Sequence, residues 1–308
     1  MSGYILAYNT IEGVGLALTF SVLLTVTVHP QLSRLATWYL VMVSGATLAL
    51  SNLLLAFSGH QGQSTAPFSL CLIQASLIYS TPIWLLLSAT AFAVQFHLTT
   101  LFYIGKQPGR HISKDNRLIW IFPTGIFVVV TIALLAVGIS QPDLVEVDDD
   151  GFYCHLKQNI GANTVTVFSV IYAPTAITLE ALTCRLLYRY WRISRKLDFR
   201  ARSNGVISVG TVARLVAFTV AALLAIITCA LYLLPSIQNF KLVIIYNALL
   251  TQSGLVILGL NRSVVITWMF WRRQRASDES SDTNTLASET ASERSIDLHF
   301  PAREATMV

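Results

Sequence analysis

Seven long apolar runs constrain this chain more than any other feature of its sequence. An α-helix needs about 20 consecutive apolar residues to cross a bilayer, and each run is long enough. The strands of a membrane barrel would alternate with period two, whereas these runs are continuous. The sequence therefore predicts an all-α polytopic membrane protein, a seven-transmembrane-helix bundle over residues 11–260. The expected spans are 11–29, 37–57, 69–103, 117–139, 163–187, 213–235 and 242–260.

Composition agrees with a membrane location. The chain is 54% hydrophobic and 12% charged, while a soluble domain carries about 25% charged residues. The first run has no basic region before it and is too long for a cleaved signal peptide, so we expect an uncleaved span.

The basic residues predict the orientation. If residues 1–10 are extracellular, all Lys and Arg except Lys157 and Lys241 fall on the inner side. Basic loops mark the cytoplasmic face, so we expect the N-terminus outside and the C-terminus in the cytoplasm. The expected location is the plasma membrane. The net charge of +5 then reflects topology and does not indicate nucleic-acid binding.

The C-terminal part is expected to lie on and below the inner membrane surface. Residues 261–275 predict a short amphipathic helix, with Trp268 and Trp271 at the headgroups and arginines near anionic lipid; the alternative is that span seven continues to Phe270. Residues 276–308 predict a disordered cytoplasmic tail. Its acid-flanked hydroxyls are candidate phosphorylation sites, and the alternative is a passive solubilising tail. The candidates are Ser277, Ser280, Ser281 and Thr283.

The expected chain has seven spans, a short outer N-terminus and a Ser/Thr-rich tail. Cys71 lies at the outer end of span three and Cys154 in the second outer loop. Together these features resemble a G-protein-coupled receptor. The segment "SLCLIQASLIYSTPIW" (69–84) is similar to predicted receptors of mushroom-forming fungi. Gln252 and Gly254 resemble the helix-seven Gln-Gly of secretin-like and cyclic-AMP-receptor-like families. The resemblance implies a Cys71–Cys154 disulfide, an extracellular ligand and a heterotrimeric G protein as cytoplasmic partner.

Two rhodopsin-like motifs are missing. Gln95, Phe96 and His97 stand where the Asp-Arg-Tyr triplet is expected, and "QSGLVILGLNRS" (252–263) replaces Asn-Pro-x-x-Tyr. A receptor-like scaffold without G-protein coupling is therefore an alternative.

Ligand contacts are expected in the outer half of the bundle. Tyrosine suits a mostly apolar pocket with few polar groups, although it also serves interhelical hydrogen bonds and interfacial belts. Glu12, near the mouth of span one, is the only charge at that level, which favours a small apolar or neutral ligand. The candidates are Gln74, Tyr79, Tyr172, Tyr232, Tyr246 and Asn247, together with Phe152 and Tyr153 of the loop.

An activation switch is expected near the cytoplasmic ends of spans three, five and six. Glu180 is an acid well inside span five, and such groups face the bundle or a partner. It could pair with His97, beside Gln95, or with Arg214, and thus hold the inactive arrangement. The alternative is local pairing with Arg185.

The sequence contains no catalytic motif and no phosphate-binding loop, so we expect a protein that is not an enzyme and has no cofactor. The acids and His155 of "EVDDDGFYCHLK" (146–157) are interpreted as surface charge, without a specific metal site. The alternative to a receptor is a seven-helix transporter or lipid-handling protein, which would keep ionisable groups or broken helices at mid-membrane.

Overall fold

The computed structural model describes residues 3–29, 34–63, 66–105, 117–148, 150–157, 160–196, 240–260 and 264–269, together with scattered helical positions between 214 and 227. Its long helices are α1 (Gly3–Val28), α2 (Ala36–Phe57), α3 (Phe68–Gly105), α4 (Arg117–Ser140), α5 (Ile160–Lys196) and α7 (Phe240–Gly259). A 3-10 turn, η2 (Pro142–Leu144), and two short strands, β1 (Val145–Val147) and β2 (Cys154–Leu156), connect α4 to α5.

Six of the described helices are long and apolar enough to cross a membrane. The chain is therefore a multi-pass helical membrane protein. Of the expected span 213–235 only scattered helical positions are described, and the rest lies outside the described residues. The first helix begins at Gly3, several residues before the expected start at 11, so most of the expected N-terminal segment is helical.

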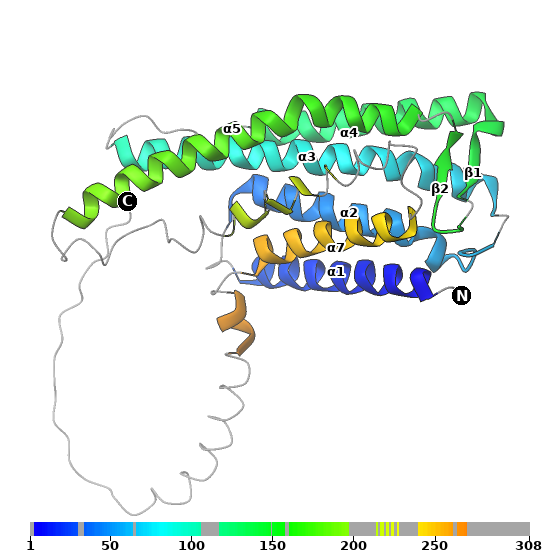
Figure 1. Ribbon diagram of the computed structural model, residues 1–308, viewed down its shortest axis with the longest axis horizontal. Coiled ribbons are helices and arrows are strands. Elements are labelled where there is room, and N and C mark those ends of the chain that lie inside the picture. The colour runs from blue at the N-terminus through cyan, green and yellow to red at the C-terminus, as the bar shows by residue number, and fades with distance from the viewer. Residues whose placement is uncertain are drawn as a thin grey trace, which may run out of the picture. The chain divides into compact units, whose positions relative to one another are not determined.

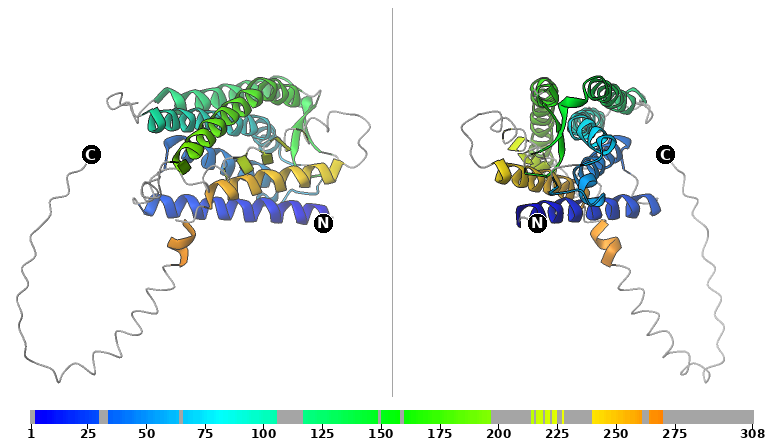
Figure 2. Two further views of the ribbon diagram at one scale, coloured as in Figure 1. Left: turned by 60° about the vertical axis from the view of Figure 1, so that its left-hand side comes forward. Right: turned by 90° about the vertical axis from the view of Figure 1, so that its right-hand side faces the viewer.

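The helices of residues 1–261 lie side by side with α3 at the centre (Figures 1 and 2). Helix α3 packs against α2, α4 and α5, while α1 packs against α2 and α7. The outer faces keep large apolar side chains exposed, among them Phe20 of α1, Val129 of α4 and Val170 of α5. Such a surface is suited to lipid, because lipid tails are as apolar as these side chains.

Both strands lie at one end of the bundle, near the N-terminus (Figure 1). We call this the hairpin end and the opposite one the far end. The strands pair antiparallel, with Glu146 opposite His155 and Val147 opposite Cys154. Helix α1, the α2–α3 loop and the hairpin meet there, because Gln61 of that loop bonds to Asn9 of α1 and to the carbonyl of Phe152.

Helix α2 stops at the hairpin end through a glycine cap. Gly59 has φ +74°, a left-handed conformation that glycine adopts without steric cost. The amide of His60 donates to the carbonyl of Leu55, and the amide of Gly59 donates to that of Ala56. This pair of bonds is the Schellman motif, and it turns the chain toward α3.

Residues 262–308 form a second unit. Within it, residues 264–269 are helical. The remainder of the expected amphipathic helix and the tail, with Ser277, Ser280, Ser281 and Thr283, lie outside the described residues.

Candidate functional site

A disulfide joins the hairpin to the first turn of α3. Cys71 and Cys154 are bonded, with their Cα atoms 5.1 Å apart, as the family resemblance implies. Both cysteines are buried in a cluster with Leu55, Leu134 and Leu156. The bond therefore ties the connection between α4 and α5 to the packed interior at the hairpin end.

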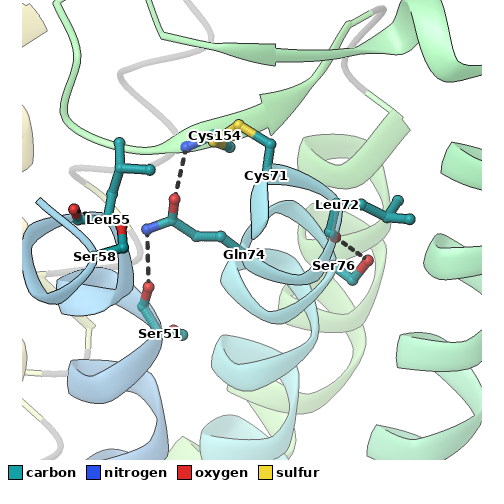
Figure 3. Close-up of a disulfide and its surroundings, with 8 residues drawn as sticks. All are labelled: Ser51, Leu55, Ser58, Cys71, Leu72, Gln74, Ser76 and Cys154. Atoms are coloured by element: carbon teal, nitrogen blue, oxygen red, sulfur yellow. Dashed lines mark hydrogen bonds between the residues drawn. A yellow bond between two sulfur atoms is a disulfide. The ribbon is translucent and has the colours of Figure 1, made fainter. Parts of the chain in front are cut away.

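The carboxamide of Gln74 reinforces this attachment (Figure 3). Its Oε1 accepts a hydrogen bond from the Cys154 amide at 3.1 Å, and its Nε2 donates to the Ser51 carbonyl at 3.0 Å. Gln74 is fully buried. One side chain thus links α2, α3 and β2, and both ends of the amide that was expected to meet a ligand are used within the protein.

Phe152 fills the space between the hairpin, α1 and α7. It is fully buried and meets Tyr8 edge to face at a centroid distance of 5.5 Å. Ile5 and Ala248 complete the cluster, and Tyr153 packs against it. Phe152, a candidate ligand contact, is thus a packing residue at the hairpin end, and its contact with a ligand stays a prediction.

The hairpin turn is held by its own backbone and by the α2–α3 loop. The amide of Gly62 donates to the carbonyl of Gly151 at 3.1 Å. Gly151 has φ +71°, and an added Cβ would lie 2.8 Å from Cα of Gly62. Only glycine satisfies both the conformation and the close approach at this position.

Charges on the hairpin pair across its strands. The carboxylate of Glu146 lies 2.8 Å from the ammonium nitrogen of Lys157 and 3.4 Å from Nε2 of the His155 ring. The hydrogen bond from Lys157 to Glu146, followed by their mutual attraction, raises the pKa of Lys157. The pair is solvent-accessible, so it contributes little to stability.

The remaining ligand candidates that the structure describes lie on three different helices, α3, α5 and α7. Tyr79 packs against the disulfide cluster, and Gly161 lies so close that a Cβ there would be 2.2 Å from its ring. Tyr172 stacks on Phe168 within α5. Tyr246 is 53% exposed, with Asn247 beside it on α7. Tyr232 lies outside the described residues.

The sequence reasoning missed a buried polar cluster around Glu12. The Glu12 carboxylate accepts hydrogen bonds from Asn52 of α2 at 2.7 Å and from Gln252 of α7 at 2.5 Å. Glu12 is 1% exposed. These three residues, here called the Glu12 cluster, join three helices about 14 Å below the start of α1, counted at 1.5 Å per residue.

A signal for this position exists in the sequence. The buried residues of α1 recur every three or four positions, namely Ile5, Tyr8, Glu12, Gly15, Thr19, Val22 and Val26. This spacing is that of one helix face. Glu12 shares its face with small and apolar residues, which indicates an inward position instead of one at the mouth of the span.

Toward the far end, α3 makes polar contacts with two neighbouring helices. Gln95 accepts a hydrogen bond from Thr37 of α2, and Nδ1 of His97 lies 2.8 Å from the Thr183 hydroxyl of α5. Thr183 already donates to the Leu179 carbonyl at 2.7 Å. Its oxygen therefore accepts from His97, which places the His97 proton on Nδ1.

The other switch candidates lie at the same level or farther out. Glu180 is buried on α5, three residues before Thr183, so both face α3. Arg185 follows on α5. Burial and, secondarily, the charge of Arg214 lower the pKa of Arg34, which places Arg214 near the connection between α1 and α2.

Among the described residues, no group of three or more His, Cys, Asp or Glu side chains is arranged to hold a metal ion. Comparison of the chain with models of known protein families and with curated proteins finds no match.

Proposed function

We propose that this protein is a seven-helix membrane receptor that transmits the binding of a small, apolar or neutral extracellular ligand to a heterotrimeric G protein. The observation that supports this most is the disulfide between Cys71 and Cys154, which fastens a short hairpin over one end of a helical bundle. That arrangement matches the second outer loop of the receptors that the sequence resembles.

The two ends of the bundle suit the two halves of this task. At the hairpin end, Phe152 packs between α1 and α7 and Tyr153 packs against the same cluster, so a ligand that displaces Phe152 would change how these helices meet. Toward the far end, the contact of His97 with Thr183 links α3 to α5. Ligand would act by a population shift toward a bundle in which the cytoplasmic end of span six moves away from spans three and five.

The extension of α5 favours the same proposal. Its apolar part ends at Arg189 while the helix continues to Lys196. A basic helical projection of this kind offers a contact surface for a cytoplasmic partner and for anionic lipid.

The test is guanine-nucleotide exchange on a heterotrimeric G protein in vesicles that contain the purified full chain. A panel of neutral lipophilic compounds is added from outside, with empty vesicles as the control. The proposal expects at least one compound class to accelerate exchange only when the protein is present. No acceleration by any class, together with measurable flux of a compound across the vesicle membrane, contradicts it.

A second candidate, a seven-helix carrier, is favoured by one observation. The Glu12 cluster places a carboxylate inside the bundle, and intramembrane ionisable groups commonly mark ion or substrate pathways. The flux measurement above distinguishes the carrier from the receptor.

A further inference from the structure

The Glu12 carboxylate is surrounded by neutral partners. Among the described residues, its two oxygens receive only amide donors, from Asn52 and Gln252. The sequence of α2 contains no Asp, Glu, Lys, Arg or His, and Tyr39 at its far end is its one titratable residue. Taking a bare carboxylate out of water is unfavourable unless a positive charge compensates it.

The other elements against α1 do not supply that charge among the described residues. Helix α7 carries Lys241 in its first turn and Tyr246, which is exposed; Lys241 precedes Gln252 by eleven residues, about 16 Å along a helix. From the hairpin, uncharged Phe152 reaches α1. On α1 itself the nearest titratable group is Tyr8, one turn before Glu12.

Two buried oxygens, one in the Glu12 cluster and one two helical turns after Glu12 on α1, have no hydrogen-bond partner among the described residues. They are Oε1 of Gln252 and Oγ1 of Thr19, and these residues are 4% and 1% exposed. Thr10 of the same helix, by contrast, donates to the carbonyl one turn before it. Buried polar atoms almost always have a hydrogen-bond partner. Two buried oxygens without one therefore indicate a binding site for a hydrogen-bond donor or a cation.

Gly15 brings the Gln252 oxygen next to α1. A Cβ on Gly15 would lie 2.2 Å from Oε1 of Gln252, so the carboxamide occupies the place of a missing side chain. Along α1, Gly15 follows Glu12 by three residues and precedes Thr19 by four, so all three share one face. The carboxylate and the two unpartnered oxygens thus follow one another along the α1–α7 contact.

Polar side chains continue this column toward the hairpin end. Asn9, one turn before Glu12, exchanges two hydrogen bonds with Gln61 of the α2–α3 loop. Gln61 is 8% exposed. An ion that enters at Gln61 would meet amide oxygens before it reaches Glu12.

We propose that Glu12 and Oε1 of Gln252 bind one small monovalent cation, a proton or a sodium ion, that enters from the hairpin end. Sodium is a hard cation that takes oxygen ligands, which the carboxylate and the amide provide, and a proton binds the carboxylate oxygen directly. The bound cation compensates the carboxylate and thereby stabilises the contact of α1 with α2 and α7. The inference holds for a receptor and for a carrier alike, so it does not rest on the proposed function.

Thermal unfolding of the purified full chain in detergent tests this site. One series exchanges N-methylglucamine chloride for sodium chloride at fixed pH and ionic strength, and a second lowers the pH in sodium-free buffer. A cation that binds only the native state raises the apparent Tm by mass action, and we expect a rise of about 2–4 °C. A rise in the first series identifies sodium, and a rise in the second identifies the proton.

Variants locate the effect. Glu12→Gln keeps the shape of the side chain and should abolish the rise, whereas Glu146→Gln, at a half-exposed carboxylate of the hairpin, should retain it. Gln252→Met keeps the carboxylate but removes the amide oxygen, so it should reduce the rise and serves if Glu12→Gln does not fold. A wild-type Tm that is constant in both series, or a Glu12→Gln or Gln252→Met response equal to that of the wild type, overturns the proposal.

Discussion

At the scale of single residues, two buried carboxamides form hydrogen bonds between helices. Gln74 connects α3 to α2 and to the hairpin, and Gln252 connects α7 to α1. Each is buried with its donors or acceptors facing groups of another helix. A carboxamide can donate and accept at once, which suits the place of Gln74, where three elements meet.

Replacing Gln74 by leucine should destabilise the protein by about 1–3 kcal/mol, because the Cys154 amide and the Ser51 carbonyl would each lose a buried partner. Thermal unfolding in detergent measures the loss. Gln63→Leu is the matched control, since Gln63 is exposed and bonds only locally to the Gly59 carbonyl. An equal effect of both substitutions would show that the Gln74 bonds are not important to stability.

Individual residues also show where sequence reasoning ends. The Cys71–Cys154 pair came from a family resemblance and is present. The depth of Gln74 and Glu12 along their helices was open to prediction, but the partners of these side chains were not. Glu12 and Gln252 are 240 positions apart, and periodicity identifies a buried face without naming the helix that it contacts.

At the scale of elements, α1, α2 and α7 pack closely because glycines lie at their contacts. Leu255 of α7 lies against Gly45 of α2, and Met42 of α2 lies against Gly259 of α7. Small residues let membrane helices approach and gain van der Waals contact, in the absence of a hydrophobic driving force between them.

Substituting Gly45 by alanine should therefore destabilise the bundle by about 1–3 kcal/mol through overpacking. The new Cβ would lie 2.4 Å from Cδ1 of Leu255. Gly125→Ala in α4 is the control, since a Cβ there meets nothing within 4 Å, and alanine is the better helix former. If the unfolding temperatures of both variants fell by the same amount, that result would argue against the close α2–α7 contact.

The hairpin depends on its disulfide, which chemical labelling can confirm. Denatured protein treated with maleimide without reductant should label at Cys184, which is free, and stay unlabelled at Cys71 and Cys154. Mass spectrometry of peptides reads each site. After reduction both should label. Labelling of Cys71 and Cys154 before reduction would exclude the bond.

At the scale of the whole molecule, the apolar runs predicted the described spans closely, because bilayer thickness sets their length. The start of α1 at Gly3 was not foreseen, since the polar residues before Glu12 interrupt the apolar pattern. In the structure, Asn9 bonds to Gln61, which explains why a polar side chain is tolerated in that first stretch of the helix.

Orientation is a prediction for the entire chain. The distribution of Lys and Arg predicts that the C-terminus lies in the cytoplasm. An epitope tag placed after Val308 should bind antibody only after the membrane is permeabilised, whereas a tag before Met1 should bind without permeabilisation. The reverse pattern would invert the topology and place the hairpin on the cytoplasmic side.

The receptor proposal is tested most directly by basal guanine-nucleotide exchange on a heterotrimeric G protein, measured with wild-type and variant chains in the same vesicles. Thr183→Val removes the hydroxyl that meets His97, while Thr178→Val removes an exposed hydroxyl that bonds only within α5. If the contact between α3 and α5 favours the inactive bundle by about 1 kcal/mol, Thr183→Val should exchange about fivefold faster than wild type, and Thr178→Val should match wild type. Exchange by all three chains equal to that of empty vesicles would contradict the account.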